Sequence, residues 1–364
     1  MSENSKTCSA CILPADYPNI SFDPSGRCNY CQKWFSRYQS IDFEAQMKLL
    51  ANILSKYRGK TRPYDCLVGI SGGKDSCYSA YLLKKFNMNP LGYTFDNGFL
   101  TESALENIHK TVDALSIGHI FVRPNPEYMK SLYRKFLLTT GEFCTVCNIG
   151  IRSALYRVAR GYGIKLVVSG HSNRTEANSP KEFYTSSTGY FKNAMRNSLS
   201  KKEIYGHMYY SQLRRIFWHL TKTPFFLQMP SYVPWKEEEL VKELEEKFNW
   251  QGMFGEQHKD CRMSDAKEYL KLKKFDVTEY TAKLSSLIRD NQMTKEQALF
   301  LADRQKKSLQ ENADQIQDQL RQEFDLSEED LQKALDASHL PYISKGDSLL
   351  TKIKLFYESM IFKK

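Results

Sequence analysis

The chain of 364 residues lacks the features that would place a protein in a membrane or a secretory class. No apolar run approaches the length of a membrane span, and the first six residues are polar rather than the start of a hydrophobic leader. Internal repeats, low-complexity tracts and the Gly-x-x-x-x-Gly-Lys-Ser/Thr spacing of kinase and GTPase phosphate loops are also absent. We therefore expect a cytoplasmic, globular protein with no signal peptide and no membrane span.

The composition indicates a folded protein but leaves the class of partner open. Hydrophobic residues make up 41% and aromatic residues 13% of the chain, which is enough for a sizeable core. The 52 Lys and Arg residues exceed the 42 Asp and Glu residues, giving a net charge of +10. This positive balance suits nucleic acid, ATP or an anionic sugar, so charge alone does not choose between them.

Four of the nine cysteines form two Cys-x-x-Cys pairs near the N-terminus, Cys8 with Cys11 and Cys28 with Cys31. The proline-containing segment around them is too short to bury a core of its own. In a reducing compartment, pairs at this spacing are metal ligands more often than disulfides. We expect four thiolates to hold a structural Zn²⁺ in a closed tetrahedral site, with four unligated thiols as the alternative.

Apolar and amphipathic segments alternate through the middle of the chain. The expected strands cover residues 65–70, 90–96, 119–123 and 165–169, and the expected helices cover 77–87, 101–116, 126–138 and 148–162. Buried strands separated by helices predict an α/β fold with a parallel sheet covered by helices on both faces. Because ligands bind at the carboxyl ends of such strands, we expect three loops to meet there: 71–76, 96–98 and 170–173.

The first of these loops is the most informative segment of the chain. It reads Ser71-Gly72-Gly73-Lys74-Asp75-Ser76. A glycine turn before a helix presents backbone N–H groups to an anion, and the serine hydroxyls and the lysine add donors and positive charge. The segment resembles the signature of the PP-loop ATP pyrophosphatases, which implies ATP binding, attack on the α-phosphate and release of pyrophosphate. A glycine turn that carries a lysine by chance is the alternative interpretation.

These features divide the chain into four expected parts. Residues 1–34 form a four-cysteine zinc knuckle and residues 35–60 a helical linker. Residues 61–230 form the PP-loop ATP-binding domain. Residues 231–364 form a helical C-terminal region, since almost all of the chain after residue 264 has helical spacing with acidic and basic faces.

A third pair, Cys144 and Cys147, opens a predicted helix, and Cys261 is the single cysteine downstream of the nucleotide domain. A helix N-terminus favours thiolates. In the PP-loop tRNA thiolation enzymes, a pair in this place and one later cysteine hold a [4Fe-4S] cluster, and the resemblance implies the same possibility here. A second zinc with a fourth ligand such as His258, or no metal at all, are the alternatives.

Several segments resemble the N-acetyl sugar amidotransferases of surface-polysaccharide biosynthesis, the WbpG/PseA-like family. The resemblance covers most of residues 7–300 and includes the phosphate loop, both N-terminal cysteine pairs and the segments 144–151, 233–239 and 260–298. It implies that ATP adenylates the N-acetyl oxygen of a sugar or nucleotide-sugar. Ammonia would then displace AMP and leave an acetamidino group, as in lipopolysaccharide, pseudaminic acid or legionaminic acid biosynthesis.

The same resemblance implies a partner, because the chain carries no recognisable glutaminase signature. A separate glutaminase subunit, or free ammonium, would supply the nitrogen. The residues of the loop 71–76 would hold pyrophosphate and stabilise its charge as it leaves. Asp75 or Asp96 would orient Mg²⁺ or the nucleotide, unless Asp75 is only a favourable acid at a helix N-terminus. Beside Gly170, His171 would act as acid or base near the α-phosphate, or would be an ordinary histidine at a strand end.

Two other functions compete with amidine formation. The segment Gly170-His171-Ser172-Asn173 resembles a Gly-His-Asn segment of the thiolation enzymes, so ATP-dependent tRNA thiolation with a three-cysteine [4Fe-4S] cluster is the alternative. Nucleic acid is a partner only under that alternative, and no RNA-binding module is recognisable. A third, non-enzymatic possibility is a binding module built on a vestigial nucleotide fold, which the intact phosphate loop disfavours.

Overall fold

The computed structural model describes residues 7–60, 63–171, 174, 176, 180, 183, 186–208, 224–252 and 260–343. Within them, five parallel strands form one sheet in the order β3-β2-β1-β4-β5. The strands are β1 Cys66–Gly69, β2 Pro90–Phe95, β3 Gly118–Val122, β4 Leu166–Ser169 and β5 Phe225–Gln228. The direction of strand addition reverses between β1 and β4, so the crevice outside their carboxyl ends is the place where this type of sheet binds ligands.

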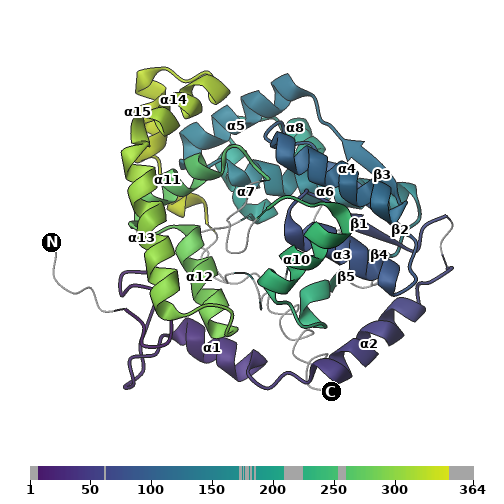
Figure 1. Ribbon diagram of the computed structural model, residues 1–364. Coiled ribbons are helices and arrows are strands. Elements are labelled where there is room, and N and C mark those ends of the chain that lie inside the picture. The colour runs from purple at the N-terminus through teal and green to yellow at the C-terminus, as the bar shows by residue number, and fades with distance from the viewer. Residues whose placement is uncertain are drawn as a thin grey trace.

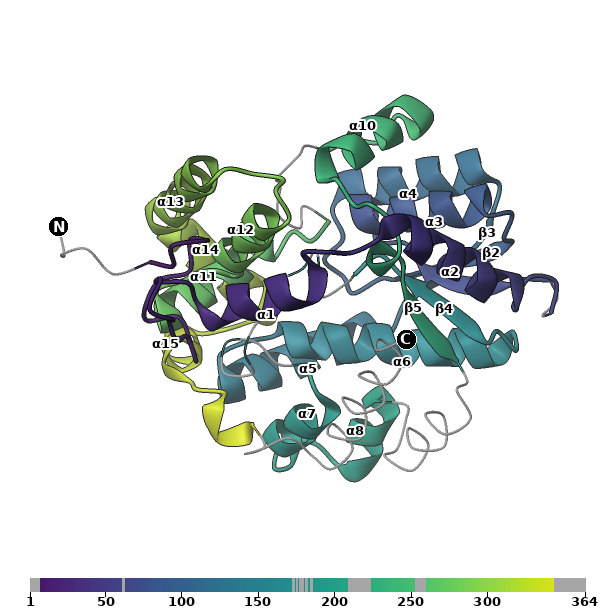
Figure 2. The same ribbon diagram turned by 90° about the horizontal axis from the view of Figure 1, so that it is seen from below.

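The helices before residue 209 surround the sheet and extend from it. They are α1 Asn29–Tyr38, α2 Phe43–Ser55, α3 Lys74–Lys85, α4 Glu102–Leu115, α5 Pro126–Thr140, α6 Cys144–Gly161, α7 Thr188–Met195 and α8 Lys201–Met208. In the edge-on view, α3 and α4 lie on one side of the sheet and α6 lies on the other (Figure 2). The predicted parallel sheet with helices on both faces is confirmed.

The helices after residue 228 form the C-terminal region, which is mostly helical as expected. They are the short 3-10 turn η1 Met229–Ser231, α10 Glu237–Phe248, α11 Ser264–Phe275, α12 Glu279–Arg289, α13 Lys295–Glu311, α14 Ala313–Phe324, α15 Glu328–Asp336 and the 3-10 turn η2 Leu340–Tyr342. Helices α11 to α15 gather at one side of the molecule with α1, whereas α10 lies next to α3 (Figure 1). Among the described residues, no helix has both the length and the apolar character needed to cross a bilayer.

Alternation along β1 explains how the sheet is buried on both faces. Cys66 and Val68 belong to one apolar cluster with residues of α2, α3, α4 and α10, whereas Leu67 belongs to another with residues of α6. Successive side chains of a strand point to opposite faces, so one short apolar run serves both layers. The strands expected from the sequence are all present, with ends that differ from the predicted ones by a single residue at most.

Several elements differ from expectation, among them α7 and α8, which the sequence does not predict. The sequence does not predict β5, because three apolar residues and a glutamine have no periodicity of their own and only pairing with β4 makes them a strand. The expected linker of residues 35–60 is not one helix: α1 begins at Asn29, within the expected knuckle, and ends at Tyr38, and Asp42 caps the start of α2. The helix after the phosphate loop begins at Lys74 rather than at residue 77, since Gly73 is its N-cap and Asp75 lies in its first turn.

Close packing between the ends of β4 and α3 generates a test of the fold. A Cβ atom added to Gly170 would lie 2.3 Å from the backbone oxygen of Asp75. We expect Gly170→Ala to lower the free energy of unfolding by about 2 kcal/mol, because backbone must move to admit the methyl group. The matched control is Gly161→Ala, where no atom lies within 4 Å of the added Cβ and the unfolding free energy should not fall. Equal denaturation midpoints for both variants would contradict this close approach.

Candidate functional site

The phosphate loop connects the end of β1 to the start of α3, at the crevice between β1 and β4. Gly72 has φ +84°, and a Cβ there would lie 2.3 Å from the backbone oxygen of Ala104. Both the backbone conformation and the space therefore require glycine at this position. The loop has the strand, turn and helix setting that an anion-binding segment needs.

Hydrogen bonds inside the loop hold its shape. The Ser76 hydroxyl donates to the backbone oxygen of Gly73 at 2.8 Å and accepts from the backbone N–H of Ser71 at 3.0 Å. The backbone oxygen of Gly72 accepts a hydrogen bond from the indole N–H of Trp250 at 2.9 Å. Trp250 follows α10, so the C-terminal region fixes the turn from outside the sheet domain.

Two side chains that precede or open α10 contact the first turn of α3. The indole N–H of Trp235 donates to Asp75 Oδ1 at 2.8 Å. Lys74 Nζ lies 3.1 Å from Asp75 Oδ2 and 3.4 Å from Glu237 Oε1. The Glu237 side chain is 3% exposed, which makes it one of the most deeply buried carboxylates of the described chain. Its place is fixed by Gln292, whose Oε1 accepts the backbone N–H of Glu237 at 2.8 Å.

A second lysine approaches this group from α12. Lys283 Nζ lies 3.7 Å from Glu237 Oε2, and its side chain is 11% exposed. Glu237 therefore lies between two ammonium groups, one from the phosphate loop and one from the C-terminal region. The carboxylate of Glu176 adds a third negative charge that acts on both lysines.

Burial and neighbouring charges shift the pKa values of Lys74, Asp75 and Lys283. Burial alone would lower the pKa of Lys74, but the carboxylates of Asp75 and Glu237 outweigh it and hold that pKa above its ordinary value. Burial alone would raise the pKa of Asp75, but the ammonium groups of Lys74 and Lys283 keep it below its ordinary value. Burial and the nearby charge of Lys74 lower the pKa of Lys283. At neutral pH Lys74 and Asp75 are therefore both charged.

The other predicted site residues at the carboxyl ends of the strands are placed as follows. Gly170 packs against the backbone of Asp75, and His171 is exposed just after it. Asp96 Oδ2 pairs with Arg123 at 2.6 Å, and its Oδ1 accepts the backbone N–H of Gly98 at 3.0 Å. Ser172 and Asn173 lie outside the described residues, as does His258.

The two predicted Mg²⁺ ligands, Asp75 and Asp96, both take part in contacts within the chain. Magnesium needs carboxylate oxygens that are open to it. Each oxygen of Asp75 already faces a donor, the indole of Trp235 or the ammonium of Lys74, and each oxygen of Asp96 is likewise engaged. Asp75 joins the phosphate loop to Trp235 through this hydrogen bond, and orientation of Mg²⁺ or the nucleotide by Asp75 or Asp96 stays a prediction.

The four N-terminal cysteines form a buried group whose sulfur atoms all lie within 4.8 Å of one another. The Sγ atoms of Cys8 and Cys31 are 3.8 Å apart, and those of Cys11 and Cys28 are 3.9 Å apart. Tetrahedral Zn²⁺ with Zn–S bonds of about 2.3 Å requires sulfur separations of about 3.8 Å. The group therefore fits a single tetrahedral metal ion, and its four ligands leave no open position for a substrate.

Arg289, the last residue of α12, faces this metal centre. Its Nε donates to Cys31 Sγ at 3.2 Å, and its second amino group lies 3.6 Å from Cys11 Sγ. Four thiolates around one divalent ion carry a net negative charge, which a guanidinium group compensates. The same helix thus carries Lys283 toward the phosphate loop and Arg289 toward the metal centre.

The mid-chain cysteines share one neighbourhood but form no tight group. Cys144 and Cys147 each interact electrostatically with Cys261, and Asn97 donates a hydrogen bond to Cys147 Sγ at 3.2 Å. Among the described residues, the N-terminal cysteines are the single set close enough to hold one ion. A multi-iron cluster spaces its ligands more widely than one ion does.

The position of Cys144 at the start of α6 does not make its thiol acidic. Burial raises its pKa well above the ordinary value, and burial raises the pKa of Cys147 to about 12. Both thiols are therefore protonated unless a metal displaces the proton. The expected effect of the helix N-terminus is outweighed here by desolvation.

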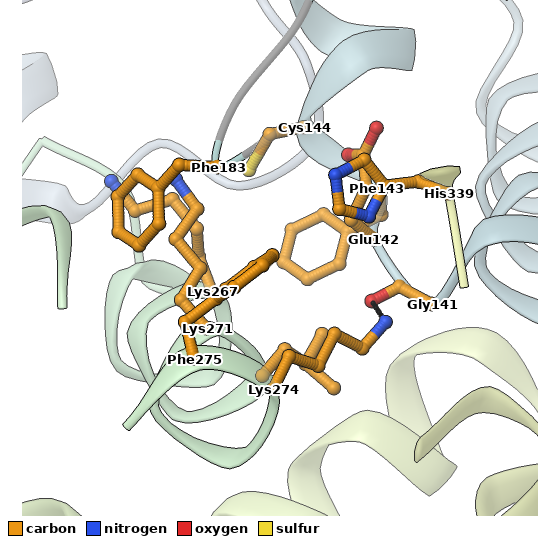
Figure 3. Close-up of a pocket in the computed structure, with 11 residues that line it drawn as sticks. Gly141, Glu142, Phe143, Cys144, Phe183, Lys267, Lys271, Lys274, Phe275 and His339 are labelled. Carbon is orange, nitrogen blue, oxygen red and sulfur yellow. Dashed lines mark hydrogen bonds between the residues drawn. The ribbon is translucent and has the colours of Figure 1, made fainter. Parts of the chain in front are cut away.

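A small cavity beside Cys144 lies apart from the phosphate loop (Figure 3). Its walls combine aromatic rings with lysines of α11, and Lys274 donates to the backbone oxygen of Gly141 at 2.8 Å. Lys267 and Lys271 both pair with Glu279, at 2.8 and 2.9 Å. These lysines tie α11 to α12 and to the end of α5.

Sequence reasoning missed the side chains that reach the site from the C-terminal region: Trp235, Glu237, Trp250, Lys283 and Arg289. Trp235, Glu237 and Arg289 lie in segments that carry the amidotransferase resemblance, but their spacing says nothing about the phosphate loop. Lys283 carries no sequence signal of its own, because a solvent-exposed lysine is the ordinary expectation for a helix.

Comparison with known proteins gives the following likenesses. Residues 239–355 match the family described as LPS biosynthesis protein WbpG-like, C-terminal domain. An uncharacterised protein of Methanocaldococcus jannaschii is 30% identical over 131 residues, 36% of this chain and 46% of that protein. The tRNA-specific 2-thiouridylase MnmA 2 of Fusobacterium nucleatum is 31% identical over 118 residues, 30% of this chain and 34% of that protein. The chain thus spans less than half of the length of these curated relatives.

Among solved structures, the NMN synthetase of Francisella tularensis aligns with a TM-score of 0.34 at 15% identity, over 79% of this chain and 98% of that one. At that score the likeness does not establish a shared fold. The WbpG-like match, the thiouridylase relative and the glycine loop at the β1–β4 crevice together support an ATP-utilising enzyme of the PP-loop pyrophosphatase class.

The buried charges at the loop predict a specific loss of stability. Glu237→Gln would leave Lys74 and Lys283 without the carboxylate between them, so we expect the free energy of unfolding to fall by about 3 kcal/mol. Glu238→Gln, an exposed neighbour in the same turn, should change it by less than about 0.5 kcal/mol. Denaturant titration of both variants without nucleotide is the measurement. Similar midpoints would mean that Glu237 does not compensate the two lysines.

The geometry of the N-terminal cysteines predicts one bound metal ion that depends on all four thiols. Cys28→Ser should reduce the zinc content by about one equivalent per chain, measured by elemental analysis, and should lower the thermal midpoint because metal binding contributes folding energy. Cys66→Ala removes a buried thiol of β1 and should leave the zinc content unchanged. Full zinc retention by Cys28→Ser would be incompatible with a four-cysteine site.

Proposed function

We propose that this protein is an ATP-dependent amidotransferase that converts the N-acetyl group of a sugar into an acetamidino group during surface-glycan biosynthesis. The observation that carries the proposal is the glycine loop of residues 71–76, which lies at the point where strand addition to the sheet reverses. The side chain of Lys74, within this loop, is largely buried. The WbpG-like match of residues 239–355 supports a sugar substrate of the lipopolysaccharide or nonulosonic acid type.

The reaction has two steps. The N-acetyl oxygen attacks the α-phosphorus of ATP, the bond from that phosphorus to the β-phosphate oxygen breaks, and pyrophosphate leaves. Ammonia then adds to the activated carbon, and the carbon–oxygen bond breaks as AMP leaves with the former acetyl oxygen. Two protons of ammonia stay on the new nitrogen and the third is released to a base, so the products are the amidinium sugar, AMP and pyrophosphate.

The residues of the chain serve the first step through charge. Backbone N–H groups at Gly72 and Gly73 and the ammonium of Lys74 face the position of the departing pyrophosphate and stabilise its developing negative charge. Asp75 keeps Lys74 charged and, through Trp235, keeps the first turn of α3 in place. His171, exposed just after β4, is proposed as acid or base near the α-phosphate.

Ammonia requires a source, for which we propose a separate glutaminase subunit. The metal held by Cys8, Cys11, Cys28 and Cys31 has a structural role in this proposal, and zinc is the proposed ion. Neither the four cysteines nor the zinc ion takes part in bond making.

A second candidate is ATP-dependent tRNA thiolation. Two observations favour it: the likeness to a tRNA-specific 2-thiouridylase, and the shared neighbourhood of Cys144, Cys147 and Cys261. Under this alternative the three cysteines would hold a [4Fe-4S] cluster, and sulfide would take the place of ammonia.

One experiment separates the two candidates. Anaerobically purified protein is given ATP with either an N-acetylated nonulosonic acid or nucleotide-sugar plus ammonium, or unmodified tRNA plus sulfide, and AMP and pyrophosphate are quantified. Release only in the sugar arm, with ¹⁸O from a labelled acetyl group found in AMP, is the expected result. Release only in the tRNA arm would replace the proposed function by thiolation.

The role of the loop lysine gives a further prediction. Lys74→Ala should reduce AMP release by about 100-fold or more, because the departing pyrophosphate loses its buried cation. Lys85→Ala, an exposed lysine at the other end of α3, should retain the rate of the unmodified protein. Full activity of Lys74→Ala would remove the loop from the mechanism and favour a vestigial nucleotide fold.

A further inference from the structure

A buried group of charges joins the phosphate loop to the C-terminal region. Lys74 opens α3, Glu237 opens α10, and Lys283 lies in the middle of α12. The two lysine Nζ atoms lie 3.4 and 3.7 Å from the two oxygens of the same carboxylate. Lys283 and the loop lysine thus contact the same carboxylate, although more than two hundred residues separate them in sequence.

Packing alone does not account for this arrangement. Two ammonium groups that share a carboxylate in a buried place cost more desolvation energy than apolar side chains of the same size. Glu237 Oε2 also has no hydrogen-bond partner among the described residues. Buried charge groups of this kind that lie beside a ligand-binding loop are typical of functional sites.

A polyphosphate is the ligand that matches the group. It carries several negative charges, whereas Glu237 carries one, so it can compete with that carboxylate for both ammonium groups. Backbone N–H groups at the start of α3 supply the remaining donors on the side of the sheet. The second lysine comes from the opposite side, on a helix that Arg289 ties to the cysteine metal centre.

We propose that Lys283 is a second phosphate-binding lysine of the nucleotide site, supplied by the C-terminal region, and that Glu237 bridges Lys283 and Lys74 until the phosphates bind. This inference rests on the proposed use of ATP. It makes the nucleotide site incomplete without α12, and it gives the region matched by the WbpG-like family a direct part in binding ATP.

Binding measured by calorimetry tests the inference. The probes are α,β-methylene-ATP, which resists cleavage at the α-phosphate, and inorganic pyrophosphate, both with Mg²⁺. Lys283→Met should bind both probes about 10- to 100-fold more weakly than the unmodified protein, since one charge-assisted contact to phosphate is lost. Lys283→Arg keeps the charge and should recover part of the affinity. Lys307→Met, an exposed lysine of α13, is the matched control and should bind normally.

Thermal unfolding without ligand measures how much stability the Lys283→Met variant loses, and calorimetry measures its affinity, so the structural and the binding role of Lys283 are tested separately. Equal affinity of Lys283→Met and the unmodified protein for both probes would overturn the inference while leaving ATP use intact, whatever the change in the thermal midpoint. No binding of either probe by the unmodified protein would overturn both the inference and the proposed function.

A labelling experiment on the unmodified protein does not depend on the folding of a variant. An adenosine polyphosphate that ends in pyridoxal forms a Schiff base with a lysine amine next to its phosphates, and borohydride reduces that C=N bond to a stable amine. Mass spectrometry should find the label on Lys283 as well as Lys74, with ATP protecting both. Label on Lys74 alone would contradict a second phosphate-binding lysine.

Discussion

The buried carboxylate of Glu237 between Lys74 and Lys283 is the interaction on which the site depends. It crosses the boundary between the sheet and the C-terminal helices, and it is strong because little water reaches it. Removal of Glu237 would leave the two lysines with less negative charge beside them in a buried place, which costs several kcal/mol. The two parts of the chain are therefore coupled at the phosphate loop itself.

Two further contacts make the same connection without relying on charge pairs. Trp235 donates its indole N–H to Asp75, and Trp250 donates its indole N–H to the backbone oxygen of Gly72. Large aromatic side chains bury much apolar area while keeping one polar donor for a specific partner. Together they fix the turn that has to face an anion, so the loop does not need to order itself when ligand arrives.

Helix α12 connects the metal centre with this loop. Arg289 donates to the thiol groups of the N-terminal cysteines, and Lys283 lies six residues earlier on the same helix. A helix transmits position over that distance because its backbone hydrogen bonds make it stiff. The four-cysteine group is thus linked physically to the phosphate loop, although a metal ion held by all four thiols would have no open position for a substrate.

The sequence by itself determined the parallel α/β sheet, the phosphate loop and the four-cysteine group, because each depends on residues close together in the chain. The signals are the alternation of apolar segments, a glycine turn before a helix, and paired cysteines. It did not determine β5, which is a strand only because it pairs with β4. Nor did it reveal Trp235, Glu237, Lys283 or Arg289 as site residues. Those roles arise when elements far apart in sequence meet, and whether a lysine is exposed or faces a buried carboxylate depends on that packing rather than on its neighbours in the chain.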